Sequence, residues 1–177
     1  MSITKRLWLG LGALLAVSFA AMLWLGADLV HTAPPIPDRV VAANGQVLYT
    51  RADIERGRQV WQSIGGQQLG SIWGHGALLA PDWSADWLHR ETEAMLELNA
   101  RAETGQPYAL LPEGEQARIQ AQVKPQMRGN TYDGANHRIV VSALRAQAIS
   151  QVAAHYESLF GNDPATHGLR VAYAMRE

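Results

Sequence analysis

The side chains of this chain that could bind a metal ion or move a proton are its histidines and their acidic neighbours. There are six histidines: His31, His75, His89, His137, His155 and His167. No two of them stand four residues apart, the spacing at which one helix face presents two imidazoles to a metal ion. His89 and Glu93 have that spacing, but a structural metal site takes about four ligands. We therefore expect this pair to be a surface hydrogen bond or ion pair.

Several kinds of active site are missing from the sequence. Without cysteine, the chain can form no disulfide, no thiolate metal site and no covalent link to a c-type haem. It contains neither the G-x-S-x-G turn of a serine hydrolase nor a phosphate-binding loop ending in Lys-Ser or Lys-Thr. Met127 as an axial haem ligand, and Trp73, Trp83 and Trp87 as a stacking surface, are both less favoured than simple packing. We predict no catalytic, cofactor-binding or metal-ligating residue.

Composition limits the classes of partner. The chain has 177 residues, room for about one domain plus an additional element. Its formal net charge is −1, and no run of basic residues is longer than Lys5-Arg6, so the sequence predicts no nucleic-acid partner.

The N-terminus predicts a membrane-spanning helix. Residues 7–27 carry no charge, and at about 1.5 Å per residue this length crosses the roughly 30 Å hydrocarbon core of a bilayer. Lys5 and Arg6 precede the stretch and Asp28 follows it, which predicts a cytoplasmic N-terminus and an exported domain. The alternative, a cleaved signal peptide, has a shorter apolar core of roughly 7 to 15 residues, so an uncleaved anchor is favoured.

A β-hairpin is predicted after a proline-rich exit from the membrane. Asn44 and Gly45 are expected to form a type I′ turn between strands at Val40-Val41 and at 47–49. Thr50 and Asp53 match a capping box, which opens a helix that ends at Gly65-Gly66. The apolar face expected for this helix consists of Ile54, Val60, Trp61 and Ile64.

Three more helices and a second small β element complete the expected fold, which is mainly α. The helices lie between Asp82 and Gly105, between Pro112 and Pro125, and between Ser142 and Gly161. The second helix is expected to stop before Pro125, because proline lacks the N–H that a helix needs. The β element turns at Asp133-Gly134.

Two long segments and a short one resemble a known family. They are "PPIPD", "GQVLYTRADIERGRQVWQSIGGQQLGSIWGHGALLAPDWSADWLHRE" and "NTYDGANHRIVVSALRAQAISQVAAHYESLFG". Together they resemble the N-terminal region of the quinol-dependent nitric oxide reductases, over nearly the whole chain. In that family, an N-terminal membrane helix and an exported cytochrome c-like domain precede a large catalytic domain in the membrane.

The resemblance implies a cytochrome c-like helical domain that lacks haem. Gly66, Leu69 and Gly70 stand where the two cysteines and the histidine of a haem-binding C-x-x-C-H would be. It also implies that the complete enzyme reduces nitric oxide to nitrous oxide with quinol, using haem b and a non-haem iron whose ligands lie outside this chain. The expected partners are quinol, the lipid bilayer and the catalytic domain of the same polypeptide, in the bacterial inner membrane.

On this basis we divide the chain into four parts. Residues 1–30 are the transmembrane anchor, and 31–50 are the proline-rich exit and the hairpin. Residues 51–161 are the periplasmic cytochrome c-like domain, and 162–177 lead into a membrane domain that this sequence lacks. The chain is therefore expected to be a fragment with a structural or interface role and no catalytic site of its own.

Two residues are candidates for contacts with the membrane domain. His75 lies between two glycines, where a haem edge would face a redox partner, and Asp82 follows in the same loop. The hypothesis is that both are polar contacts near the site of quinol oxidation, and the alternative for His75 is an ordinary surface histidine. Two other functions remain open: an independent signal-anchored periplasmic binding or sensor module, and a small b-type haem protein that uses His75 or His89.

Overall fold

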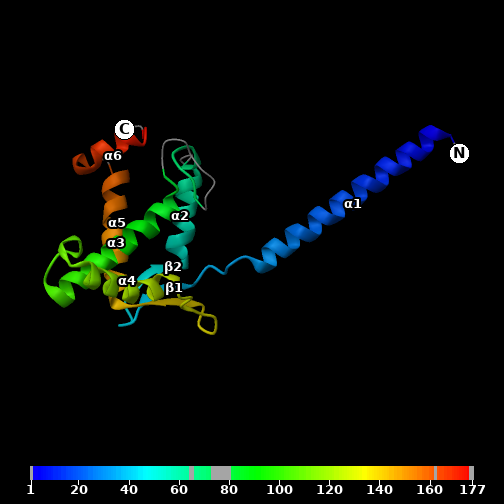
Figure 1. The fold of residues 1–177 in the computed structure, drawn as a ribbon. Helices are drawn as coiled ribbons and strands as arrows, with labels where there is room; N and C mark the ends of the chain where they lie inside the picture. The colour runs from blue at the N-terminus through cyan, green and yellow to red at the C-terminus, as the bar shows by residue number, and fades with distance from the viewer. Residues whose placement is uncertain (1, 64–65, 73–80, 162, 176–177) are drawn as a thin grey trace. The chain divides into compact units, whose positions relative to one another are not determined.

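The structure, a computed structural model, describes residues 2–63, 66–72, 81–161 and 163–175 (Figure 1). The chain forms two compact units, Met1–Ile36 and Pro37–Glu177. Besides the longer helices and the strands, the second unit contains short helical segments: η1 (Gly66–Gln68), η2 (Tyr108–Leu110), η3 (Pro164–Thr166) and α6 (His167–Ala172).

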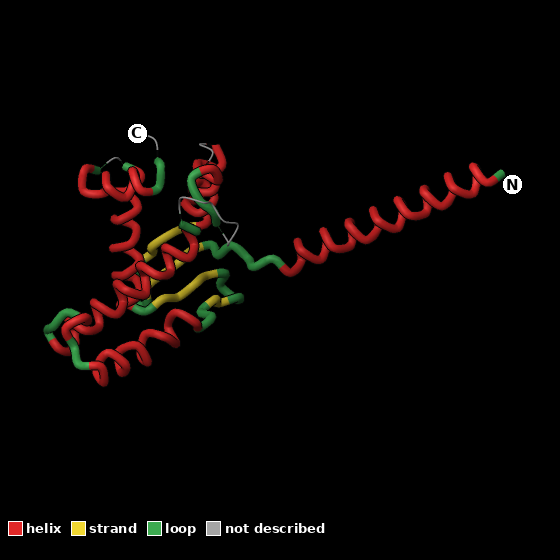
Figure 2. The backbone as a smooth tube through the Cα atoms, turned by 45° about the horizontal axis from the view of Figure 1, so that its top comes forward, coloured by secondary structure: helices red, strands yellow, loops and turns green. Residues whose placement is uncertain are grey.

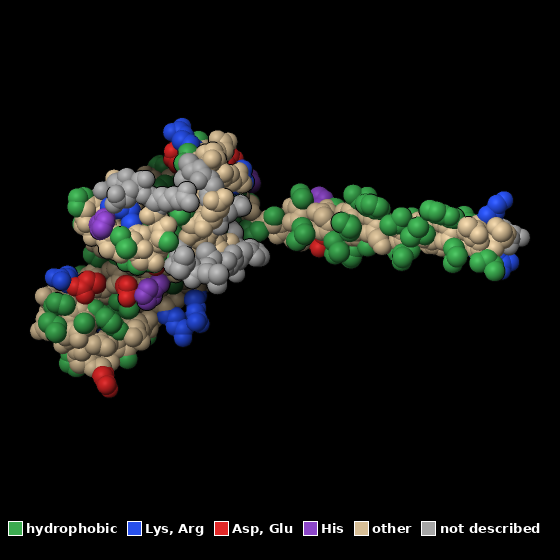
Figure 3. All heavy atoms as spheres, turned by 90° about the horizontal axis from the view of Figure 1, so that it is seen from above, with side chains coloured by type: hydrophobic (Ala, Val, Ile, Leu, Met, Phe, Trp, Pro, Cys, Tyr) green, Lys and Arg blue, Asp and Glu red, His purple; other side chains and the backbone are tan. Residues whose placement is uncertain are grey.

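The first unit is built on one helix, α1 (Ile3–Thr32), which confirms the long apolar helix predicted for the N-terminus. Its most apolar window has a mean hydropathy of 2.0, so α1 is long and apolar enough to cross a membrane. Hydrophobic side chains follow one another along the face of α1 seen in Figure 3. The Ser18 hydroxyl donates to the Leu14 carbonyl oxygen at 2.9 Å, which satisfies a polar group that hydrocarbon could not.

The second unit contains a four-stranded sheet made from both predicted β elements (Figure 2). Its strands are β1 (Arg39–Ala42), β2 (Val47–Thr50), β3 (Tyr132–Asp133) and β4 (Arg138–Val141). Strands β1 and β2 pair antiparallel, as do β3 and β4. Strand β1 also pairs with β4 in parallel, which gives the order β2-β1-β4-β3. The hairpin near the N-terminus of this unit is thereby joined to residues 132–141.

The turn of the first hairpin differs from the predicted type I′. Gly45 has a φ of 88°, but Asn44 is not among the described residues with positive φ. The Gly45 N–H donates to the Ala42 carbonyl oxygen, and the Ala42 N–H donates to that of Gln46, both at 2.8 Å. This pattern is a type I turn followed by a left-handed glycine. Asn44 instead accepts a hydrogen bond from the Gln46 N–H at 3.0 Å, which requires no positive φ.

Helix α2 (Arg51–Ser63) begins with the predicted capping box. Asp53 Oδ2 accepts from the Thr50 N–H at 2.9 Å, and the Asp53 N–H donates to Thr50 Oγ1 at 3.3 Å. The predicted burial is wrong for Ile54 and Val60, which are 36% and 52% exposed. The reason is that α2 contacts mainly β2 and η1, the segments at its two ends.

Helix α3 (Trp83–Thr104) begins and ends at the predicted residues. The Asp82 side chain accepts a hydrogen bond from the Ala85 N–H at 2.9 Å and caps the first turn. Gly105 ends the helix with a φ of 72°, a left-handed conformation that favours glycine.

Helix α5 (Ala143–Phe160) is also confirmed, with its cap. The Ser142 hydroxyl oxygen accepts from the Arg145 N–H at 3.1 Å, and Gly161 follows the last turn. Its buried side chains face the sheet and α3, where a core cluster contains Ala42, Val141, Ala146 and Ile149.

Helix α4 (Glu113–Arg128) continues past Pro125, so the prediction that it stops there is wrong. The missing proline N–H costs one helical hydrogen bond, and contacts from elsewhere in the chain offset that cost. Gln126 accepts from Ser142 Oγ at 2.6 Å through its side chain and from Arg145 Nη1 at 2.9 Å through its carbonyl oxygen. Both partners are distant in sequence, so no local sequence pattern predicts these contacts.

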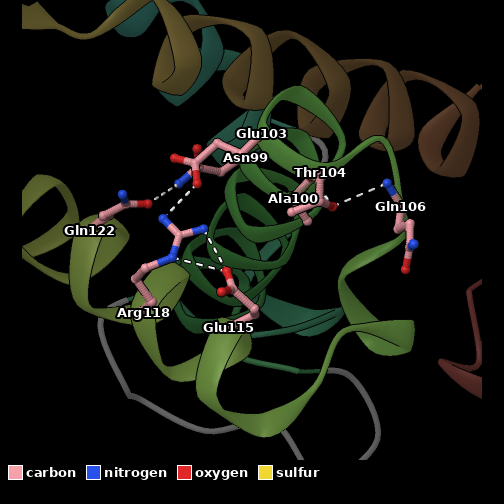
Figure 4. A network of polar contacts seen from close by, with 8 residues as sticks. All are labelled: Asn99, Ala100, Glu103, Thr104, Gln106, Glu115, Arg118 and Gln122. Atoms are coloured by element: carbon pink, nitrogen blue, oxygen red, sulfur yellow. Dashed lines mark hydrogen bonds and ion pairs between the residues drawn. The ribbon is translucent and has the colours of Figure 1, made fainter.

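Helices α3 and α4 are bridged by polar side chains near their connection (Figure 4). Asn99 donates to Gln122 at 2.8 Å, and Arg118 forms ion pairs with Glu103 at 2.6 Å and with Glu115 at 2.8 Å. Between α3, α4 and α5 lies a second core cluster, made of Met95, Ala100, Leu111, Ile119, Val123 and Ala148.

Candidate functional site

The strongest candidate for a functional site is the segment after α2, where the sequence resembles a haem-binding frame. This segment is held against the start of α3 by Ser71, which pairs with Asp82 in an isolated β-bridge. Ser71 Oγ donates to Asp82 Oδ2 at 2.7 Å, and the Trp83 N–H donates to the Ser71 carbonyl oxygen at 2.8 Å.

Two glycines of this segment lie against indole rings. A Cβ atom added at Gly66 would come closer than 3.0 Å to the ring of Trp61. A Cβ atom added at Gly70 would come within the same limit of the Trp83 ring, and would lie 2.8 Å from the Pro81 carbonyl oxygen. Because Cβ atoms essentially never approach other atoms so closely, both positions require glycine in this packing.

The two indoles belong to an aromatic cluster, which consists of Trp61, Trp83, Trp87, Tyr156, Phe160 and Tyr173. Trp83 is buried and meets the rings of Phe160 and Tyr173 edge to face, at centroid distances of 5.5 and 5.8 Å. Trp87 stacks on Tyr156 at 5.4 Å. Such contacts each add about 0.5 to 1.5 kcal/mol to the burial of the rings. The aromatic cluster lies beside Gly66 and Gly70, with Trp83 as its buried member.

A polar group borders the aromatic cluster. Tyr156 Oη and Arg90 Nε both donate to Asp86 Oδ2, at 2.7 and 2.8 Å. Burial raises the pKa of Asp86, but these hydrogen bonds outweigh burial and hold that pKa below its usual value. The pKa of Tyr156 is raised well above its usual value, mainly by burial and also by the hydrogen bond to Asp86. The pKa of His155 is lowered, mainly by burial and also by the positive charge of Arg90.

These pKa directions define what the polar group can do. Near neutral pH, Asp86 is charged, the Tyr156 hydroxyl keeps its proton and His155 is neutral. The hydrogen bond from Tyr156 to Asp86 therefore fixes the ring of Tyr156 within the aromatic cluster.

A buried charge pair lies on the other side of Trp87. Glu91 is 2% exposed, and it accepts from Trp87 Nε1 at 3.0 Å and from Arg145 Nε at 2.5 Å. Arg145 also donates to the carbonyl oxygen of Gln126, so the pair links α3, α5 and α4. Sequence reasoning missed both charged residues. The available signal was that Trp87 and Glu91 stand four apart on a predicted helix, whereas nothing local points to Arg145.

The structure bears differently on His75 and Asp82, the predicted contacts with the membrane domain, and on the predicted surface pair of His89. His75 lies outside the described residues. The Asp82 carboxylate accepts from Ala85 and Ser71, so Asp82 stabilises the start of α3, and its contact with a membrane domain stays a prediction. His89 Nε2 lies 3.3 Å from Glu93 Oε1 with both side chains more than half exposed, which confirms the predicted surface pair.

The packing interpretation is confirmed for the residues that the structure describes. Trp83 and Trp87 pack in the aromatic cluster, Met127 packs against the core between α3 and α4, and Trp73 lies outside the described residues. Within the described ranges, no group of three or more His, Cys, Asp or Glu side chains is placed to hold a metal ion.

These observations define the class of protein: a mainly helical domain with a small sheet, preceded by an apolar helix long enough to span a membrane. The family model of the NorB cytochrome c-like domain, a domain of nitric oxide reductase, matches residues 37–177. Because the match covers well over half of the chain, the chain belongs to this family. The expected cytochrome c-like fold class is thereby confirmed. No curated protein matched the chain.

The residues at the haem position do not fit a covalently bound haem. A c-type haem is attached through C-x-x-C-H, and this chain has no cysteine anywhere; the resemblance implies that Gly66, Leu69 and Gly70 stand at the corresponding places. In addition, the rings of Trp61 and Trp83 lie directly against the two glycines. The chain thus belongs to a cytochrome c-like domain family, and indole rings lie against Gly66 and Gly70.

Proposed function

We propose that this chain is the N-terminal part of a membrane-bound nitric oxide reductase that takes its electrons from quinol. The family match is the observation that carries the proposal, and it favours a reductase part over an independent sensor module. In the complete enzyme, two molecules of nitric oxide, two electrons and two protons give nitrous oxide and water. One quinol supplies both electrons and both protons. Haem b and non-haem iron would be held by the catalytic domain of the same polypeptide.

The choice of quinol over a haem protein as electron donor rests on the glycine and indole packing. A domain that passes electrons from a haem protein needs a redox group of its own. Here the attachment residues are replaced by Gly66, Leu69 and Gly70, and indole rings lie against the two glycines. A donor that reaches the catalytic domain through the lipid bilayer does not depend on this domain for electron transfer.

The proposed location is the bacterial inner membrane, with the N-terminus in the cytoplasm and the second unit in the periplasm. Support comes from α1, whose length and hydropathy suit a bilayer, and from Lys5 and Arg6 at its N-terminal end. No glutamate or aspartate precedes Asp28, so the charged side chains before the apolar stretch are all positive and the first one after it is negative.

The proposed role of the second unit is structural: it covers the catalytic domain at the membrane surface. Support comes from α2, where Ile54 and Val60 remain exposed, and from Ile72, which is 38% exposed just after η1. These apolar side chains flank the segment in which a cytochrome c would present its haem. Their burial against a partner would stabilise the contact.

The direct test is the choice of electron donor by the complete enzyme. In membrane vesicles that contain the full polypeptide, nitric oxide consumption and nitrous oxide formation should be rapid with a short-chain quinol. Reduced cytochrome c should support no turnover above the level of vesicles without the enzyme. Turnover with cytochrome c but not with quinol would reject the proposal.

Replacing His75 with alanine tests the proposed contact between this domain and the region of quinol oxidation. In the full-length enzyme, we expect His75→Ala to lower quinol-driven turnover by about tenfold, the loss of roughly one charge-assisted hydrogen bond. Haem content and the unfolding temperature should stay unchanged. The matched control is His89→Ala, which removes an exposed histidine paired with Glu93 and should leave turnover unchanged. If turnover and the quinol KM of His75→Ala equal those of the wild type, His75 is an ordinary loop residue.

A further inference from the structure

An apolar groove lies between α3 and α4, beyond the polar bridges of Figure 4. Its volume is about 370 Å³. Val123 and Met127, one turn apart on α4, line it together with Leu96 of α3. Cavities of this size, mostly apolar with a few polar groups, are typical of small-molecule sites.

Two positive charges border this groove. Lys124 and Arg128 stand one turn apart on α4, and both side chains are exposed. Within the described part of the chain, neither side chain has an ion pair or a hydrogen-bond acceptor. The remaining lining residues, Thr92 and Gln120, are uncharged, so none of the described residues that line the groove is acidic.

At the other end of the same helix pair, the positive charge of α4 is paired with acidic side chains. There, Arg118 of α4 is neutralised by Glu103 of α3 and by Glu115 (Figure 4). At the groove, by contrast, the positive charges of α4 face α3 residues that are neutral. The groove therefore combines an apolar floor with an unneutralised cationic rim, which complements a molecule that has an apolar chain and a negative head group.

We propose that this groove binds a single-chain amphiphile with an anionic head group, of the long-chain carboxylate class. The chain would lie along Leu96, Val123 and Met127, and the carboxylate would meet Lys124 and Arg128. A volume of about 370 Å³ lies within the range of small-molecule sites. The proposal is independent of the reductase assignment.

A photolabelling experiment on the full chain in nanodiscs of a zwitterionic phospholipid tests this site. The probe is a twelve-carbon carboxylate with a photoreactive diazirine near its end, and the matched probe has the same chain with a trimethylammonium head. Labelled peptides are located by mass spectrometry. We expect the carboxylate probe to label the peptides of residues 92–96 and 123–128, and the ammonium probe to label them about tenfold less, since two exposed charge pairs amount to roughly that factor.

Variants of the rim separate charge recognition from simple partition into apolar surface. The double substitution Lys124→Gln with Arg128→Gln should lower labelling by the carboxylate probe about tenfold. The control Arg58→Gln removes an exposed arginine of α2 and should change nothing. Filling the groove with Thr92→Trp should lower labelling by the carboxylate probe while the unfolding temperature is kept. Equal labelling by both probes, labelling confined to α1, or an unchanged double variant would each overturn the proposal.

Discussion

Replacing Arg145 with alanine is expected to lower the free energy of unfolding of the second unit by about 3 to 5 kcal/mol. The reason is that the carboxylate of Glu91, which is 2% exposed, would lose its ion-pair partner in the interior. The substitution also removes the hydrogen bond from Arg145 to the carbonyl oxygen of Gln126, just after Pro125. The measurement is urea unfolding of the full chain in a mild detergent, followed by tryptophan fluorescence.

Two controls show whether burial of the charge is the cause. Arg101→Ala breaks an ion pair with Glu97 at the surface of α3 and should change the unfolding midpoint little. The double substitution Glu91→Leu with Arg145→Met should recover most of the lost stability, because apolar side chains of similar size can replace a buried pair. If Arg145→Ala unfolds at the same urea concentration as Arg101→Ala, the Glu91–Arg145 pair is not a buried link between the helices.

Several helix limits of this chain were predictable because they are set by residues close in sequence. Thr50 with Asp53, Asp82 with Ala85, and the glycine that follows α3 all act within one helical turn. The two hairpins have the same local origin. These signals were sufficient for the element order and for the mainly helical fold class.

Features that depend on distant partners were not predictable from the sequence. Strand β1 pairs with β4, and nothing in Arg39–Ala42 specifies Arg138–Val141 as its neighbour. Helix α4 passes Pro125 because Ser142 and Arg145 hold the following residue. In each case tertiary contacts override or extend a local preference, a balance that a single sequence does not display.

The position of the candidate site comes from the resemblance alone, and its packing was not predicted. The resemblance located Gly66 and Gly70 at the haem position, and Trp83 was expected to pack. That its ring lies on Gly70 follows from the contact of Ser71 with Asp82, which brings the segment after α2 onto α3. The distance between residues 70 and 83 along the chain hides this contact.

Replacing Gly70 with alanine is expected to lower the free energy of unfolding by about 2 to 3 kcal/mol, the cost of overpacking a filled interior. The new Cβ would overlap the Trp83 ring and approach the Pro81 carbonyl oxygen at 2.8 Å. Trp83 cannot move aside freely, because it is 7% exposed and held by edge-to-face contacts with Phe160 and Tyr173. Urea unfolding monitored by tryptophan fluorescence measures the effect.

The matched control, Gly57→Ala, is expected to change the free energy of unfolding in the opposite direction. Gly57 lies inside α2 with open space around its Cα, so Gly57→Ala should raise the free energy of unfolding by about 0.5 to 1 kcal/mol. In a double-mutant cycle, Trp83→Phe should absorb part of the cost of Gly70→Ala, because the smaller ring leaves room for the added methyl group. A Gly70→Ala variant as stable as the wild type would mean that the space beside this glycine is open. The indole packing would then no longer support the choice of quinol as electron donor, and that choice would rest on the missing attachment residues alone.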